Sequence, residues 1–138
     1  MKLHTYLHFD GNTREAFEFY ARVLGGRIVA MMSFGSTPAC EHVPPESHDK
    51  IMHAQLEIDG YRLMATDGIP SHPHVPMAGA HVVLDVATPE RAEACFAALA
   101  EGGRIEMPIG PTFWAQRYGQ LTDRYGTAWM INCDLPQG

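Results

Sequence analysis

The sequence predicts an α+β protein in which one βαβββ unit occurs twice and builds a curved mixed sheet around a central trough. Three observations support this fold class. Strand-type alternation and helical spacing follow each other in the same order in both halves. A glycine pair ends each expected helix, and short motifs recur at a fixed spacing. The 138 residues fit a single domain, with a first unit at 1–67, a linker at 68–79 and a second unit at 80–138.

Strand-type alternation opens the first half at residues 2–9. We expect the face that holds Leu7 and Phe9 to pack on a helix, because it is the apolar one. The opposite face, expected to point into the trough, holds His4, Tyr6 and His8. An amphipathic helix follows and ends at Gly25 and Gly26.

Capping signals mark where the two helices begin. Asn12 is followed three residues later by Glu15, which resembles a capping box. Thr88 precedes Pro89, a good N-cap followed by proline at the first helical position. The second helix is expected to end at the glycine pair 102–103, as the first does at its own pair.

The other strands are predicted from alternation and from turn residues. In the first half they are expected at 27–34, 51–58 and 61–66, and in the second half at 80–86, 104–109, 113–121 and 127–133. Asp59 and Gly60 predict a tight hairpin turn. Residues 36–50 contain adjacent prolines and several charges, and we expect a loop there.

The internal repeat locates the trough. Residues 24–28 match residues 101–105 at an offset of 77, which also carries His4 onto His81. In the later strands an offset of 66 carries Met64 onto Met130. Two facing half-sheets would therefore enclose a trough lined by these four side chains at equivalent depth.

Charge and composition argue against several classes of protein. Ten basic and sixteen acidic residues give a net charge of −6, which disfavours a nucleic-acid-binding surface. No apolar run approaches the ~20 residues of a membrane span, and the N-terminus has no signal-peptide core. Three cysteines at wide spacing predict reduced thiols. We therefore expect a cytoplasmic protein that binds neither nucleic acid nor a membrane.

Motifs over nearly the whole chain carry a resemblance to a known family. They lie at 6–12, 15–20, 24–26, 50–54, 63–67, 112–114 and 121–126, with Trp129 after the last. These motifs resemble the vicinal oxygen chelate superfamily, which includes glyoxalase I, extradiol dioxygenases, fosfomycin-resistance enzymes and bleomycin-resistance proteins, and its PhnB-like branch most of all. The resemblance implies the glyoxalase/bleomycin-resistance fold and a homodimer. Some members of the branch carry a methyltransferase label. This sequence has no glycine-rich nucleotide loop, so it does not favour methyltransferase activity.

The resemblance also implies a divalent metal in the trough, held by a His or Gln and a Glu from each half. His4 and His81 fall on the first-strand positions of the two halves. Met64 and Met130 fall on the positions where carboxylates are expected. Thioethers favour soft ions such as copper(I) over zinc, nickel, manganese or iron. The cofactor prediction is therefore open between a divalent metal, soft copper and no metal.

A small-molecule pocket is the other prediction for the trough. Its candidate lining is Tyr6, His53, Met64, Phe113, Trp114 and Met130. Methionine adapts to apolar ligands, and aromatic rings can stack on a flat substrate. For Phe113 and Trp114, the alternative is packing in the core of the chain or in a dimer interface. His53 shares a face with Gln55 and Glu57, which could supply substitute metal ligands or form a solvated strand surface.

Two functions follow from these alternatives. One is a metal-assisted lyase, isomerase, transferase or dioxygenase, in which the metal acts as a Lewis acid on vicinal oxygens. The other is a metal-free protein that binds and sequesters an aromatic or apolar compound of the antibiotic type. No catalytic residue can be named. Asp67 and Asp123 are expected to stabilise turns, with a general-base role for Asp67 as the alternative.

Overall fold

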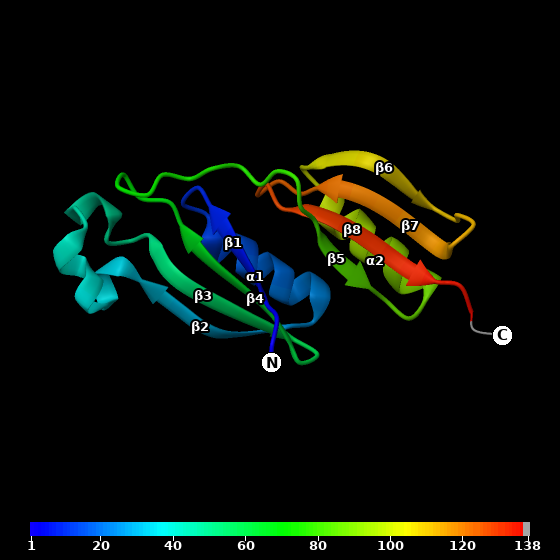
Figure 1. Cartoon of the computed structure of the whole chain (residues 1–138), viewed down its shortest axis with the longest axis horizontal. Helices are drawn as coiled ribbons and strands as arrows, with labels where there is room; N and C mark the ends of the chain where they lie inside the picture. Colours follow the sequence, from blue (N-terminus) through cyan, green and yellow to red (C-terminus); the bar gives the residue numbers. More distant parts are fainter. Residues whose placement is uncertain (137–138) are drawn as a thin grey trace. The chain divides into compact units, whose positions relative to one another are not determined.

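The chain folds into two compact units, Met1–Pro76 and Met77–Gly138. The computed structural model describes residues 1–136 (Figure 1). Each unit is a four-stranded mixed sheet with one α-helix on one of its faces. The predicted α+β class with two βαβββ units is therefore confirmed. The boundary between the units lies inside the predicted linker at 68–79.

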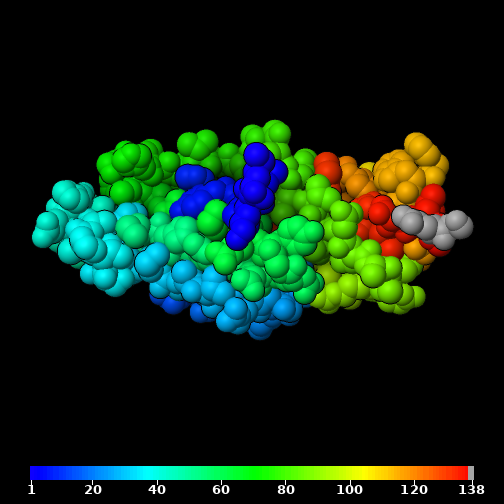
Figure 2. Space-filling model, turned by 60° about the horizontal axis from the view of Figure 1, so that its bottom comes forward, coloured from blue at the N-terminus to red at the C-terminus, as the bar shows by residue number. Residues whose placement is uncertain are grey.

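The first unit has the strand order β1-β4-β3-β2. Its strands are β1 (Thr5–Phe9), β2 (Arg27–Ser33), β3 (Ile51–Ile58) and β4 (Tyr61–Asp67). The first strand runs parallel to β4 and the other neighbours are antiparallel. Three 3-10 helices separate β2 from β3, at Phe34–Ser36, Pro38–His42 and Pro45–Ser47. The segment predicted as a loop therefore has helical turns, drawn in cyan in Figure 1, and its atoms form the cyan group in Figure 2.

The core of the first unit lies between its sheet and α1 (Thr13–Leu24). Leu7 and Phe9 are buried, as the alternation of the first strand predicted. The Phe9 ring meets Phe17 of the helix edge to face, with ring centroids 6.2 Å apart. Tyr20 is also fully buried. Burial of such rings supplies much of the stability of a unit of this size.

The predicted capping box at the start of α1 is wrong. Asn12 makes no side-chain cap hydrogen bond, and its Oδ1 is buried without a partner. The cap comes from Asp67 at the end of β4. Its Oδ1 accepts from the Thr13 backbone N–H at 3.0 Å and from Thr13 Oγ1 at 2.6 Å, and its Oδ2 accepts from the Ile51 N–H at 2.8 Å. One buried carboxylate therefore joins three elements.

The second unit repeats this architecture, with the strand order β5-β8-β7-β6. Its elements are β5 (Val82–Asp85), α2 (Pro89–Ala100), β6 (Arg104–Gly110), β7 (Ala115–Thr122) and β8 (Ala128–Asp134). The predicted Thr88 cap is confirmed, since its Oγ1 accepts from the Arg91 N–H at 3.2 Å. The predicted strand at 113–121 included Phe113 and Trp114. In the structure β7 begins at Ala115, so both residues lie before it.

Asp123 stabilises the turn that leads into β8, as predicted. Its Oδ1 accepts from the backbone N–H groups of Tyr125 and Thr127, at 2.9 and 3.0 Å. Its Oδ2 accepts from Trp129 Nε1 at 2.9 Å. Trp129 is one of the largest fully buried side chains. The carboxylate therefore satisfies the one polar atom of a buried indole.

The two glycine pairs have a shared structural reason. The first glycine of each pair, Gly25 and Gly102, adopts φ of +73°, which disfavours residues with a side chain. At the second glycine a Cβ would collide with the sheet. It would lie 2.7 Å from Ile58 Cγ1 at Gly26 and 2.3 Å from the Thr122 carbonyl oxygen at Gly103. The repeated pair thus ends a helix and lets the next strand begin against its neighbours.

In the part of the chain that the structure describes, no helix is both long and apolar enough to cross a membrane.

Candidate functional site

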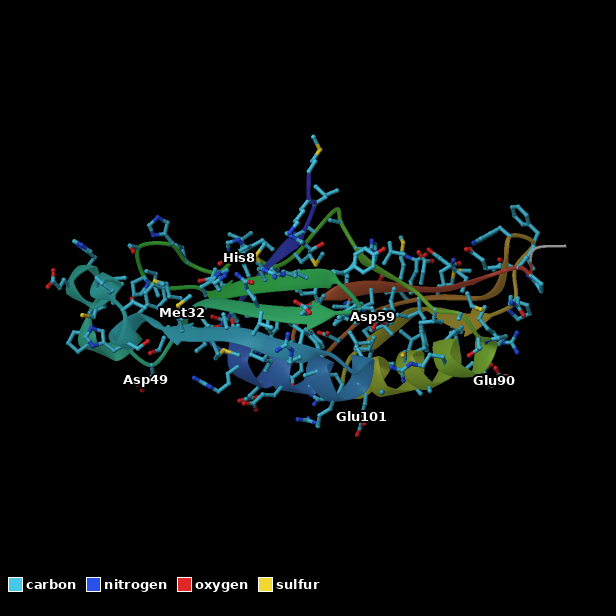
Figure 3. All side chains as sticks on the ribbon, turned by 90° about the horizontal axis from the view of Figure 1, so that it is seen from below. His8, Met32, Asp49, Asp59, Glu90 and Glu101 are labelled. Carbon is cyan, nitrogen blue, oxygen red and sulfur yellow. The ribbon has the colours of Figure 1, made fainter. Side chains whose placement is uncertain are left out.

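Each sheet has one face that its own helix does not cover. In Figure 3, His8 points away from the side on which α1 lies. We call the two surfaces the first and second helix-free faces. The first consists of Tyr6, His8, His53, Gln55, Glu57, Arg62 and Met64. The second consists of His81, Val83, Glu106, Tyr118, Gln120, Thr122 and Met130.

A chain of hydrogen bonds crosses the first helix-free face. Tyr6 Oη lies 3.0 Å from His53 Nδ1, and Gln55 Nε2 lies 2.9 Å from His53 Nε2. Arg62 Nη1 donates to Gln55 Oε1 at 3.0 Å. The Tyr6 and His53 rings are stacked, with centroids 5.7 Å apart and planes at 27°. Three strands, β1, β3 and β4, thus supply one connected polar network, which we call the relay.

Charged groups border the relay on one side. Glu57 lies between two arginines, with contacts of 3.7 Å to Arg62 and 3.7 Å to Arg27. These side chains are exposed enough that each ion pair contributes little to stability. Their effect is on position, since Glu57 holds the Arg62 guanidinium beside Gln55.

Met64 lies at the centre of the first helix-free face. It is the register partner of Tyr6 on β1 and of Gln55 on β3. Its neighbours in sequence, Leu63 and Ala65, are buried on the side of α1, so Met64 points the other way, as alternation predicted. The thioether therefore lies next to the stacked Tyr6 and His53 rings and to the relay.

Burial raises the pKa of the Tyr6 hydroxyl, and a hydrogen bond with the Thr66 side chain offsets part of that rise. Tyr6 therefore stays protonated at neutral pH. A protonated phenol can both donate and accept a hydrogen bond. Tyr6 is therefore a group of the relay with a proton available for a bound molecule, beside the charged N–H donors of Arg62.

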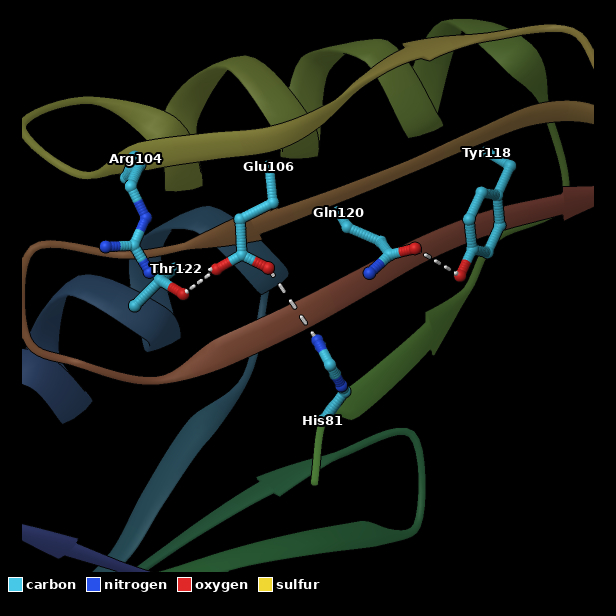
Figure 4. A network of polar contacts seen from close by, with 6 residues as sticks. All are labelled: His81, Arg104, Glu106, Tyr118, Gln120 and Thr122. Carbon is cyan, nitrogen blue, oxygen red and sulfur yellow. Dashed lines mark hydrogen bonds and ion pairs between the residues drawn. The ribbon is translucent and has the colours of Figure 1, made fainter. Parts of the chain in front are cut away.

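The second helix-free face centres on Glu106, which the sequence analysis did not identify. Its Oε1 accepts from Thr122 Oγ1 at 2.5 Å and from Arg104 Nη2 at 3.2 Å (Figure 4). Its Oε2 lies 3.9 Å from His81 Nε2. The hydrogen bonds from Thr122 and Arg104 lower the pKa of Glu106, with a smaller contribution from the His81 charge.

A β-bulge explains why Glu106 was missed. The register of β6 against β7 shifts between Ile105 and Met107, so Glu106 is an extra residue with no register partner. A bulge re-aims the side chain that it carries, and strict alternation along β6 cannot predict its direction. The repeat offers no signal for it either, because the offset of 77 aligns Glu106 with the apolar Val29.

The repeat extends to residues that the sequence analysis did not pair. Met130 is the register partner of Gln120, as Met64 is of Gln55. Tyr118 donates to Gln120 Oε1 at 3.3 Å, at the place where His53 contacts its own glutamine in the first unit. In the sequence, an offset of 65 carries Gln55 onto Gln120, one less than the offset of 66 between Met64 and Met130. A search at that offset would have found this second match.

Three aromatic residues, two just before β7 and one within it, form a surface cluster. The Phe113 and Trp114 rings meet edge to face with centroids 4.9 Å apart, and Trp114 meets Tyr118 in the same way at 5.3 Å. Phe113 is 90% exposed and Trp114 is 44% exposed. The prediction that Phe113 and Trp114 pack in the core of this chain is therefore wrong. The two other predictions for them, stacking on a substrate and packing in a dimer, stay predictions.

The predicted metal site combines two histidines with two methionines. His4 precedes β1 and is exposed, and His81 precedes β5 in the other unit. Met64 and Met130 offer thioethers, which suit zinc, nickel, manganese and iron poorly. Within residues 1–136, no three His, Cys, Asp or Glu side chains lie close enough together to hold a metal ion. The trough and the His4–His81 pair involve both units and stay predictions.

Comparisons with known proteins agree with the fold. The protein YjdN of Escherichia coli K12 is 37% identical over 142 residues, an alignment that covers 96% of this chain and 95% of YjdN. The crystal structure of PA1353 from Pseudomonas aeruginosa is 46% identical with a TM-score of 0.90, and covers 97% of this chain and 98% of that one. The PhnB protein from Bacillus cereus is 25% identical with a TM-score of 0.81, and covers 96% and 99%.

The family itself is shown by a match over almost the whole chain. The family model described as Glyoxalase/Bleomycin resistance protein/Dioxygenase superfamily matches residues 2–131. This agrees with the resemblance that the motifs predicted, and the structural similarity includes a PhnB protein. The chain therefore belongs to the glyoxalase/bleomycin resistance protein/dioxygenase superfamily.

Proposed function

We propose that this protein binds a small aromatic molecule on the first helix-free face and does so without a resident metal. The observation that carries the proposal is the position of Met64 beside the stacked Tyr6 and His53 rings and the relay. Ligand sites typically combine apolar and aromatic lining with a few placed polar groups. A flexible thioether adapts to a flat ligand, and the relay would fix its orientation.

Homodimerisation is part of the proposal. Members of the superfamily are expected to dimerise, and the second sheet exposes apolar side chains on β6, an edge strand of that sheet. Ile105 is 52% exposed and Met107 is 36% exposed. An edge strand with exposed apolar residues favours pairing with a second copy.

A metal-assisted enzyme of the lyase, isomerase, transferase or dioxygenase type is the second candidate. The observation that favours it is the His81–Glu106 pair, at 3.9 Å, because imidazole and carboxylate are common ligands of divalent cations. Elemental analysis of protein purified without an affinity tag tests this candidate against a His4→Ala/His81→Ala variant. Near-stoichiometric metal that the variant loses would favour the second candidate over the first.

Methyltransferase activity is not proposed for this chain. The PhnB protein from Bacillus cereus carries the label of a 3-demethylubiquinone-9 3-methyltransferase. This chain has no glycine-rich loop between a strand and a helix. Its two sheets also differ from the doubly wound parallel sheet in which such loops bind nucleotides.

Binding to chelator-treated protein tests the proposed function. The probe is 2-naphthoate, measured by isothermal titration calorimetry before and after addition of zinc, nickel, manganese or copper. We expect binding without added metal, and a loss of about tenfold in affinity in Met64→Ala, because a truncated thioether removes apolar contact. Met77→Ala is the matched control, since Met77 lies outside both helix-free faces. Binding that requires added metal would contradict the proposal.

A further inference from the structure

The relay on the first helix-free face has a direction that donor and acceptor chemistry fixes. A guanidinium only donates hydrogen bonds. Arg62 Nη1 lies 3.0 Å from one terminal atom of the Gln55 side chain, so that atom is the carbonyl oxygen. The NH₂ group of Gln55 is then the atom that lies 2.9 Å from His53 Nε2. Arg62 thus settles which way the Gln55 amide points.

The orientation of Gln55 in turn selects the tautomer of His53. An amide NH₂ can only donate, so His53 Nε2 must offer its lone pair. A neutral imidazole carries one proton, which therefore sits on Nδ1. That N–H points at Tyr6 Oη, 3.0 Å away. The Tyr6 oxygen is the acceptor in this contact, and its own proton is left for another partner.

The Thr66 hydroxyl is a donor in its own contacts, at 3.3 Å from the Ile51 carbonyl oxygen and 3.4 Å from the Asp67 carbonyl oxygen. It also lowers the pKa of Tyr6, which is the effect of a donor toward the Tyr6 oxygen and not of an acceptor for the Tyr6 proton. Hydrogen bonds to a charged acceptor are roughly twice as strong as neutral ones, so a carboxylate or phenolate oxygen is a better acceptor for that proton than a neutral oxygen. Donation from His53 to the Tyr6 oxygen makes Tyr6 a better donor still.

We infer that Tyr6 donates its hydroxyl proton to an anionic oxygen of the ligand, and that Arg62 and Gln55 enforce this choice by holding His53 in the Nδ1–H tautomer. The inference rests on the proposed function and names its ligand class, a flat aromatic molecule with a carboxylate or phenolate oxygen. Tyr6 is the contact residue. His53, Gln55 and Arg62 are positioning residues that act through it.

The tautomer can be tested without any ligand. Long-range nitrogen–proton correlation spectra of the whole protein at neutral pH report which imidazole nitrogen of His53 carries the proton. We expect a protonated Nδ1 and a bare Nε2. A proton on Nε2 in the unaltered protein would overturn the inference, whatever the protein binds.

A charge-matched pair of substitutions reverses the relay. In Gln55→Glu/Glu57→Gln the net charge of the face is unchanged, but His53 Nε2 now faces a carboxylate that only accepts. The proton should move to Nε2, and the bare Nδ1 should accept the Tyr6 proton, so that Tyr6 no longer donates outward. Thr66, the ring stack and Met64 are left as they are.

Ligand selection is measured with two probes of the same ring, 2-naphthoate and the protonated amine of 2-(aminomethyl)naphthalene. We expect the affinity of the unaltered protein for 2-naphthoate to exceed its affinity for the amine by about tenfold or more, because one hydrogen bond to a charged group contributes that much. Tyr6→Phe and the charge-matched double variant should each lose most of that preference. Tyr61→Phe is the matched control, since Tyr61 is exposed at the β3–β4 turn and lies outside the relay.

The outcomes separate the two claims. Binding of both probes with equal affinity in the unaltered protein would overturn the selection of an anionic oxygen. A preference that the double variant retains would overturn the role of Gln55 and Arg62. Binding of neither probe would contradict the proposed function and the ligand selection with it, while an Nδ1–H signal from His53 would still support the tautomer assignment.

Discussion

At the scale of single residues, hydrogen-bonding capacity determines more of the candidate site than charge does. Gln55 carries no charge, yet the donor-only character of Arg62 assigns a direction to its amide and, through that amide, to its contact with His53. Alternation in the sequence predicted the face on which Tyr6 and His53 lie. It could not predict their contact, because the rings come from β1 and β3, which are separated in the sheet by β4.

Glu106 leads to a prediction about stability and pH. Its pKa in the folded state is lowered, chiefly by the Thr122 hydroxyl and Arg104, from an ordinary value of 4.5. A lowered pKa means that the folded state favours the charged form, so this contribution is present above pH 4.5 and is lost as the pH falls through the lowered value. Chemical denaturation at several pH values should therefore show less acid-dependent loss of stability in Glu106→Gln. An identical pH dependence in both proteins would contradict the contacts drawn in Figure 4.

The three thiols should differ in reactivity. Cys95 and Cys133 are buried, whereas Cys40 is partly exposed. Burial also raises the pKa of Cys95, although the nearby Arg91 charge opposes the rise. Because the thiolate is the reactive form, we expect one thiol of the native protein to react rapidly with a disulfide reagent and two to react only on unfolding. Cys40→Ser should remove the rapid phase, and a rapid phase that persists in this variant would contradict the assignment.

At the scale of elements, local signals predicted where most helices and strands begin and end. β3 has the predicted bounds, and a glycine pair follows each helix, directly after α1 and one residue beyond the end of α2. The failure at Asn12 shows the limit of such signals. A capping box is read within four residues, but the cap of α1 comes from Asp67, which is 54 residues away from Thr13. The fold brings the carboxylate there, and no local pattern contains it.

Removing the Asp67 carboxylate should destabilise the first unit. Asp67→Ala leaves buried backbone N–H groups of Thr13 and Ile51 without their acceptor, and we expect a loss of about 3 kcal/mol in the free energy of unfolding. Asp49→Ala is the control, since Asp49 is exposed and a surface change typically costs under ~0.5 kcal/mol. Urea denaturation measures both. Equal stability of the two variants would show that Asp67 is not the cap.

At the scale of the whole molecule, the internal repeat explains the fold. Each copy buries one sheet face under its own helix, and the Gln55–Met64 and Gln120–Met130 pairs occupy matching places on the other face. Family membership and fold class could be predicted from the sequence, because motifs and repeat span nearly all of it. The bulge at Glu106 could not, since an extra residue breaks the two-residue period on which the prediction depends.

The oligomeric state is a prediction at the same scale. Light scattering at micromolar concentration should give twice the chain mass of 15.3 kDa. Ile105→Lys should shift the mass toward the single chain, because a charge on an exposed edge strand opposes pairing. A mass of one chain for the unaltered protein would contradict the homodimer, and an unshifted mass for the variant would move the interface elsewhere.

The most direct measurement of the central claim is a titration of isotopically labelled, chelator-treated protein with 2-naphthoate, followed by amide chemical shifts. The account predicts that the largest shifts fall on the first helix-free face, around Tyr6, His53, Gln55 and Met64. Shifts centred on Trp114 and Tyr118, or shifts that appear only after a metal is added, would contradict it.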